Sequence, residues 1–303
     1  MALADNETVA RALRALLDRH GYSFQYAVIK RAHELFGARK SPWRMEVVEY
    51  PVEVRGTPIH IDFILHNADP TCLLIAECKR ANPAFSDWCF AKAPYPNRLR
   101  KVIRESITRP RTSAAVVVSA DPDAIIYRAD SERIYELALE VRSRAGSDPG
   151  SDRIKGDPGN GKGTLTKAVE QVIRGMNGLI EHLSTRLQLL LDLLGGADNL
   201  GKPLVFIPVV FTTARLWTTD ADISLADIQD GVLKERALRA SEVPWLYYQY
   251  HQSPGIKHAL PITSTRPERG DTTLQQVLNT EYARTVAIVG PTGIDPFLTE
   301  PPS

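Results

Sequence analysis

The hydrophobic pattern changes its period after the first forty residues, and this change constrains the fold more than any other feature of the chain. Apolar residues recur at helical spacing over the first 20 residues and again over 23–37. Beyond that point the pattern alternates with a period of two or becomes continuously apolar, which is typical of strands. Gly56-Thr57 and the run 67–71 supply turns. The chain is therefore expected to form two helices and then three strands, at 45–55, 58–66 and 72–79.

The rest of the chain mixes both patterns. Helices are expected near 98–107 and over 131–144 and 164–194, and strands at 114–119, 204–213, 245–250 and 285–290. Residues 82–97 lack a clean period, 145–163 read as a loop or insertion, and the proline-rich tail from Pro291 is expected to be loose. This order predicts an α/β fold with a mixed sheet flanked by helices. We expect one domain with its core at 23–80 and 164–215, an insertion at about 81–163 and a C-terminal extension at about 240–303.

The composition is that of a globular chain. Of 303 residues, 43% are hydrophobic and 24% charged, and 37 basic against 36 acidic residues give a net charge of +1, which argues against a disordered, collagenous or disulfide-stapled chain. No apolar run approaches the roughly 20 residues that cross a bilayer. The first residues place acids before the apolar stretch, unlike a secretory signal. Three cysteines in strand-like surroundings suggest reduced thiols, and hence a cytoplasmic protein.

Two acids and a lysine interrupt the apolar strands, namely Asp62, Glu77 and Lys79. Side chains alternate along a strand, so Glu77 and Lys79 share a face. Asp62 joins them if paired residue numbers in the hairpin add up to 137 or 139, whereas an even sum sends it to the other face. The near-symmetric turn between Leu65 and Cys72 favours 137. The three groups are therefore expected to converge.

Such a set has a chemical use. Neighbouring carboxylates repel each other, and a hard divalent cation relieves that conflict because it prefers oxygen ligands. Mg2+, for which Mn2+ can substitute, acidifies a bound water into a nucleophile toward a phosphodiester, and a lysine can orient that water and offset charge on the phosphate. The alternative is a salt bridge on the surface of an edge hairpin. The apolar flanks favour a site, because burying these charges otherwise costs several kcal/mol.

The string IDFIL, a short turn and then LLIAECKR resembles the core of the PD-(D/E)xK nuclease superfamily, which has the restriction-endonuclease-like fold. That core has a helix, three strands, a helix and a further strand. By this resemblance Asp62 is the metal-binding aspartate, Glu77 the second carboxylate, Lys79 the lysine, and the Cys78 carbonyl a further metal ligand. Ile61 departs from the proline in the family's name. The match is specific over about 45–80.

The same resemblance implies further properties. Many members add an acid from the first helix, for which Glu34 is the first candidate here, with Gln25 and Glu46 behind it. The implied activity is Mg2+-dependent hydrolysis of a nucleic acid, with DNA preferred over RNA on the resemblance alone. Members often serve in restriction or antiphage defence and are often homodimers. A homodimer, and an activating ligand or partner protein, therefore stay open for this chain.

The window 79–111 is strongly basic. Nine basic and two acidic residues give it a local charge of +7 in a chain whose total is +1, and phosphate backbones are bound in this way. We expect nucleic-acid contacts from Arg80, Lys92, Arg98, Arg100, Lys101 and Arg104, with stacking on Phe85, Trp88, Phe90 and Tyr95. The alternative is a solvated face beside a small aromatic core.

A second motif keeps another function open. Residues 156–164, GDPGNGKGT, match the G-x-x-x-x-G-K pattern of a phosphate loop through Gly156, Gly161 and Lys162. The preceding stretch is polar and rich in Gly and Pro, unlike the buried strand that feeds a working loop. The alternatives to a nuclease are therefore a non-catalytic nucleic-acid-binding module of the same fold and a nucleoside-triphosphate-binding protein that uses Lys162.

Overall fold

The computed structural model describes twelve segments of the chain. They are residues 6–54, 56–67, 72–92, 104–106, 123–126, 134–141, 163–185, 204–219, 224–230, 232–234, 239–251 and 283–300. The expected strand at 114–119 and all but the last residue of the expected loop at 145–163 lie outside these segments, as do residues 186–194 of the long helix.

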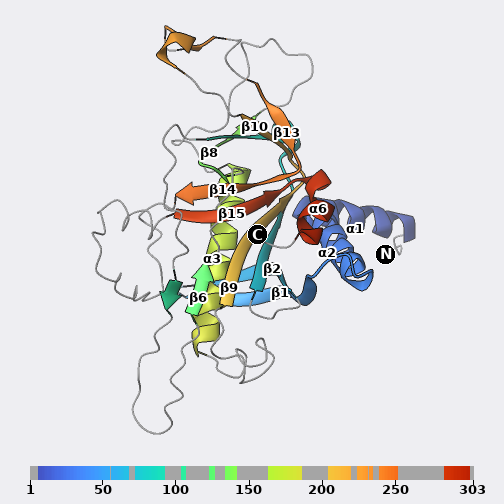
Figure 1. Ribbon diagram of the computed structural model, residues 1–303. Helices are drawn as coiled ribbons and strands as arrows, with labels where there is room; N and C mark the ends of the chain where they lie inside the picture. Colours follow the sequence, from blue (N-terminus) through green and yellow to red (C-terminus); the bar gives the residue numbers. More distant parts are fainter. Residues whose placement is uncertain are drawn as a thin grey trace.

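Within these segments nine strands form one mixed sheet (Figure 1), which confirms the expected α/β class. Its main path runs β1-β2-β3-β9-β15-β14-β7. These strands are β1 Arg44–Val54, β2 Thr57–His66, β3 Cys72–Lys79, β9 Leu204–Thr212, β15 Ala283–Val289, β14 Trp245–His251 and β7 Ile134–Tyr135. Beside this path, β6 (Asp123–Ile126) pairs with β9, and β5 (Arg104–Ser106) pairs with β6.

Strand direction follows the connections. The hairpins β1–β2 and β2–β3 are antiparallel, whereas β3 and β9 are parallel because α3 (Thr164–Thr185) lies between them in the chain. Strand β15 adds in parallel to β9 and pairs antiparallel with β14, which pairs parallel with β7. The predicted C-terminal extension therefore supplies central strands of the main sheet.

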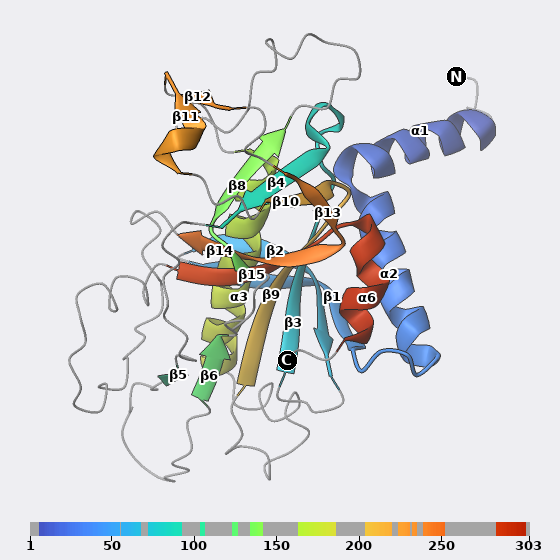
Figure 2. The same ribbon diagram turned by 45° about the horizontal axis from the view of Figure 1, so that its top comes forward.

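Helices cover both faces of this sheet (Figure 2). Helix α3 packs its apolar face, from Leu165 to Leu183, against one side of β1, β2, β3 and β9. Helix α2 (Tyr22–Gly37) and the short α6 (Ile294–Thr299) cover the other side. Helix α1 (Asn6–His20) leads away from this body in Figure 2. No helix among the described residues is long and apolar enough to cross a membrane.

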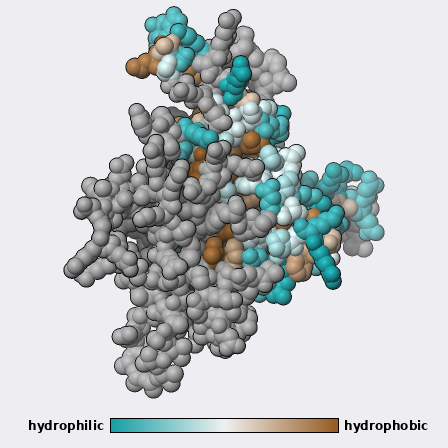
Figure 3. All heavy atoms as spheres, in the orientation of Figure 1, coloured by the Kyte–Doolittle hydropathy of each residue, from teal (hydrophilic) through white to brown (hydrophobic). Residues whose placement is uncertain are grey.

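A second sheet continues from the first. Its order is β13-β10-β4-β8, with bounds Ser241–Val243, Arg215–Thr219, Asp87–Ala91 and Leu137–Val141. The described segments also contain three 3-10 turns, η1 Pro83–Phe85, η3 Leu225–Asp227 and η5 Pro291–Gly293. The small hairpin β11 (Ile228–Gln229) and β12 (Val232–Leu233) shows as a brown patch at the top of Figure 3, and its region exposes Leu225, Ile228 and Val232.

Several expected elements are wrong. The predicted helix over 131–144 contains two strands of different sheets, β7 and β8, and the predicted basic helix near 98–107 contains strand β5. The aperiodic stretch 82–97 contains η1 and β4. The tail expected to be loose forms η5 and α6, because Phe297 and Leu298 are buried against the core. In each case pairing or packing with distant segments decides the local conformation.

The contact of α3 with the β1–β2 hairpin depends on two glycines. A Cβ at Gly178 would lie 2.9 Å from Val52 and Val54 side-chain atoms, and one at Gly175 would lie 3.0 Å from Ile61. We predict that Gly178→Leu lowers the free energy of unfolding by about 2 kcal/mol through overpacking, measured by urea denaturation. The matched variant is Gly37→Leu at the end of α2, where a Cβ meets nothing within 4 Å. Equal stability of the two variants contradicts this close packing.

Candidate active site

The register of the β2–β3 hairpin brings Asp62 and Glu77 together. The paired residues run from Phe63–Ala76 to His66–Leu73, so their numbers add up to 139, and continuing the register places Asp62 opposite Glu77. This confirms the prediction of an odd sum, which places Asp62 on the same face as Glu77, although the sum is 139 and not the favoured 137. Beyond Phe63–Ala76 the regular pairing stops, and Asp62 Oδ2 accepts a hydrogen bond of 2.6 Å from the Cys78 amide. An aspartate side chain thus takes the place of a backbone acceptor.

Glu77 is the most deeply buried member of the site. Only 3% of the residue is exposed, and it follows Leu73 and Ile75 on the face of β3 that α3 covers. Its Oε1 lies 3.6 Å from Lys79 Nζ. Burial and then the charge of Asp62 raise the pKa of Glu77 well above its ordinary value, and Lys79 opposes this shift. The predicted convergence of the two acids and the lysine is therefore present in the geometry.

Asp62 is also destabilised as an anion. Burial raises the pKa of its carboxyl to about 6, the hydrogen bond from the Cys78 amide opposes that shift, and the charge of Glu49 adds to it. The two carboxylates thus resist ionising side by side.

Glu49 is a neighbour that the sequence analysis missed. It lies between Val48 and Tyr50, whose partners in β2 are Phe63 and Ile61, so it stands opposite Asp62. Its Oε1 accepts a hydrogen bond of 2.5 Å from Gln25 Nε2, which also lies 3.5 Å from the Asp62 carbonyl. The sequence could have predicted this neighbour, because the short turn between Val54 and Thr57 fixes the β1–β2 register and so pairs residue 49 with residue 62.

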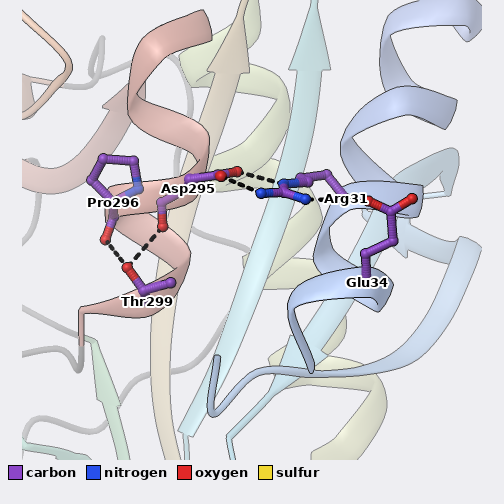
Figure 4. A network of polar contacts seen from close by, with 5 residues as sticks. All are labelled: Arg31, Glu34, Asp295, Pro296 and Thr299. Atoms are coloured by element: carbon purple, nitrogen blue, oxygen red, sulfur yellow. Dashed lines mark hydrogen bonds and ion pairs between the residues drawn. The ribbon is translucent and has the colours of Figure 1, made fainter. Parts of the chain in front are cut away.

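The expectation that Glu34 completes the site is wrong. Glu34 lies on the exposed side of α2 and forms an ion pair of 3.3 Å with Arg31, which also pairs with Asp295 of α6 (Figure 4). It is nine residues from Gln25, or about 13 Å along the helix. The reserve candidate Glu46 instead forms an ion pair of 3.3 Å with Arg44, and its carboxylate lies 3.2 Å from His66 Nδ1. Of the three helix and strand candidates, the structure places Gln25 alone beside Asp62.

The donor set fits a hard divalent cation. Asp62 and Glu77 offer carboxylate oxygens, and the Cys78 carbonyl faces β2 because its amide already does so. The Cys78 side chain packs toward α2, where burial raises the pKa of the thiol well above its ordinary value. Over the described segments, no three His, Cys, Asp or Glu side chains gather closely enough to hold a metal ion. One or two carboxylates suit Mg2+, which keeps waters and substrate oxygens in its shell.

The basic window is described only in part. Arg80 is exposed and donates a hydrogen bond of 2.6 Å to the Asp18 carbonyl, and Lys92 lies 5.6 Å from the centre of the Tyr135 ring. Arg104 lies in β5, whereas Arg98, Arg100, Lys101 and Tyr95 fall outside the described residues. Stacking of bases on Phe85, Trp88 and Phe90 is a wrong expectation, because these rings are buried in the core.

The end of the glycine-rich loop is already occupied by a carboxylate. The buried Glu140 of β8 accepts a hydrogen bond of 2.6 Å from the Leu165 amide in the first turn of α3. A Cβ at Gly163 would collide with that carboxylate, which accounts for this glycine. A phosphate on the N-terminus of α3 would meet the negative charge of Glu140. Residues 156–162, including Lys162, lie outside the described segments.

Comparisons with known proteins return no match to a family model, a curated protein or a solved structure.

The raised pKa of Asp62 makes a prediction about stability. A carboxyl with a raised folded-state pKa favours folding when it is protonated, and that contribution is lost as the pH rises through about 6. In EDTA, Asp62→Asn should therefore raise Tm by several degrees at pH 8 and change it little at pH 4.5. Asp230→Asn, at an exposed turn, is the control and should change neither value. Equal destabilisation by Asp62→Asn at both pH values would contradict the assignment.

Proposed function

We propose that this protein is a metal-dependent nuclease that hydrolyses phosphodiester bonds, with Asp62, Glu77 and Lys79 at its active site. The observation that carries the proposal is that the negative charge of the buried Glu77 has too few donors and cations around it. Among the described residues three acids are buried, and the other two have close donors. Asp87 accepts from Trp217 at 2.8 Å and pairs with Arg215 at 2.7 Å, and Glu140 accepts from the Leu165 amide.

The charge of Glu77 is less well stabilised than the charges of Asp87 and Glu140. Its ion pair with Lys79 spans 3.6 Å, and two further acids, Asp62 and Glu49, raise its pKa by their charge. A buried carboxylate in this setting costs stability unless a cation completes it. The cation, when bound, supplies an acidified water and neutralises phosphate charge.

The chain's own groups would divide the remaining work. Asp62 and Glu77 would hold the cation with the Cys78 carbonyl, and the hydrogen bond from the Cys78 amide fixes the Asp62 carboxylate. Lys79, half-exposed beside Glu77, would orient the attacking water and offset charge that develops on the phosphate. The apolar strands on either side of Glu77 exclude bulk water from one wall of the site.

The order of elements supports a restriction-endonuclease-like core. A helix, three antiparallel strands, a helix and a parallel strand occur in this order as α2, β1, β2, β3, α3 and β9, with η1 and strands β4 to β8 inserted between β3 and α3. This order agrees with the core that the sequence resembles. DNA is the proposed substrate on that resemblance, and a role in restriction or antiphage defence belongs to the same proposal.

The alternatives have less support. A non-catalytic nucleic-acid-binding module of the same fold does not require a buried, poorly compensated carboxylate beside a lysine. A nucleotide-binding role through Lys162 is opposed by Glu140 at the N-terminus of α3.

The proposal is tested by cleavage of single- and double-stranded DNA and RNA with Mg2+, Mn2+ or EDTA. We predict cleavage that EDTA abolishes and that Lys79→Ala lowers at least a hundredfold, the order expected when a group that stabilises transition-state charge is removed. Lys30→Ala, on the exposed face of α2, should cleave like the wild type. Cleavage that persists in EDTA, or equal rates for Lys79→Ala and wild type, contradicts the assigned mechanism.

A further inference from the structure

Glu49 has a backbone conformation that its place in a strand does not explain. Among the described residues, three that are not glycine have a positive φ: Arg39, Glu49 and Asp230, at 57°, 53° and 53°. Arg39 and Asp230 lie in turns, where a left-handed residue is ordinary. Glu49 lies within β1. A side chain in that conformation is strained, and strain of this kind gathers at functional sites.

The strained residue coincides with a break in the neighbouring strand. Ile61 and Ile64 of β2 both belong to the apolar cluster that contains α3, although residues three apart should point to opposite faces. Phe63 belongs to the cluster on the other face. The alternation therefore fails around Asp62, directly opposite Glu49. This local irregularity lets the Asp62 carboxylate turn along the strand to the Cys78 amide.

Gln25 ties this irregularity to helix α2. It is 7% exposed, and its amide nitrogen lies 2.5 Å from Glu49 Oε1 and 3.5 Å from the Asp62 carbonyl. The Gln25 amide therefore contacts both the Glu49 carboxylate and the backbone of Asp62. The amide also leaves the charge of Glu49 in place, because a neutral donor does not neutralise a carboxylate.

We infer that Glu49 is a positioning residue of the cation site, with Gln25 as its holder. Glu49 fixes the bend that aims Asp62 and adds negative charge at the exposed rim of the site, without itself ligating the ion. It is the additional acid near the site, in place of Glu34, which the resemblance implied as a catalytic residue. The inference rests on the proposed function for the identity of the site, since it presupposes a cation between Asp62 and Glu77.

The strain and the charge can be separated by two substitutions. Glu49→Gln keeps an oxygen that can accept the hydrogen bond from Gln25 and removes the charge. Glu49→Gly removes the charge and relieves the strain, because glycine adopts a positive φ freely. Titration with Mn2+ should show affinity about tenfold lower for both variants, as expected from losing one nearby charge. Thermal melts in EDTA should show Glu49→Gly to be at least as stable as the wild type.

The other two left-handed residues supply matched controls. Arg39→Gly and Asp230→Gly relieve the same kind of strain in exposed turns, and Asp230→Gly also removes an acid. Both should keep the wild-type affinity for Mn2+ while matching or exceeding its Tm. Gln25→Leu should weaken Mn2+ binding, and combining it with Glu49→Gln should weaken binding less than the two separate effects predict.

Two results overturn the inference. Wild-type affinity for Mn2+ in Glu49→Gln shows that the charge has no role at the site, and a large loss of stability in Glu49→Gly shows that Glu49 serves the fold. Each leaves the proposed function intact if Asp62→Asn abolishes binding. A wild-type protein that binds no Mn2+ overturns both the proposed function and this inference.

Discussion

The hydrogen bond from the Cys78 amide to the Asp62 carboxylate is the interaction on which the rest of the site depends. It lies where β2 and β3 stop pairing regularly, so a side chain links the two strands at this position and fixes the Asp62 carboxylate. Glu77 is the last buried residue of β3, and the partly exposed Lys79 follows two residues later. A regular backbone hydrogen bond at the same position would leave the Asp62 carboxylate without this donor.

The energetics of the site differ from those of the surrounding fold. The core is built from ordinary apolar packing, and its other buried acids, Asp87 and Glu140, sit against an arginine, an indole or a helix amide. At the site, burial raises the pKa values of Asp62 and Glu77, the charge of Glu49 adds to the shift at Asp62, and the charge of Asp62 adds to the shift at Glu77. Glu49 itself has a strained backbone. Stability is lost at one place, where the buried Glu77 has a single ion pair, with Lys79, and where Asp62 and Glu49 add negative charge. This is the pattern expected where a cation is to bind.

Much of this arrangement could be predicted from the strands themselves. The switch to a period of two located β1, β2 and β3, and side-chain alternation placed Glu77 and Lys79 on one face. The β2–β3 register could not be reduced to one of the two sums, 137 or 139, because the sequence of the turn over 67–71 does not fix it. Glu49 escaped notice although the tight turn at Gly56 sets its partner, because the resemblance directed attention to acids on the preceding helix.

The errors lie where distant contacts override local preference. Residues 131–144 are rich in Leu, Glu and Arg, which favour a helix. They form β7 and β8 because β8 pairs with β4 and turns Glu140 inward to the first turn of α3. Likewise, α6 has only six residues, and its helical state depends on burying Phe297 against Phe211 and Trp245. These partners are far away in the sequence, so local preferences cannot reveal them.

The central claim is that Asp62 and Glu77 share a divalent cation. Anomalous diffraction from crystals soaked in Mn2+ tests it most directly. The account predicts a peak within coordination distance of both carboxylates, on the β2 side of the Cys78 carbonyl. A peak elsewhere, or no peak at that position in crystals that show the two carboxylates facing each other, contradicts it.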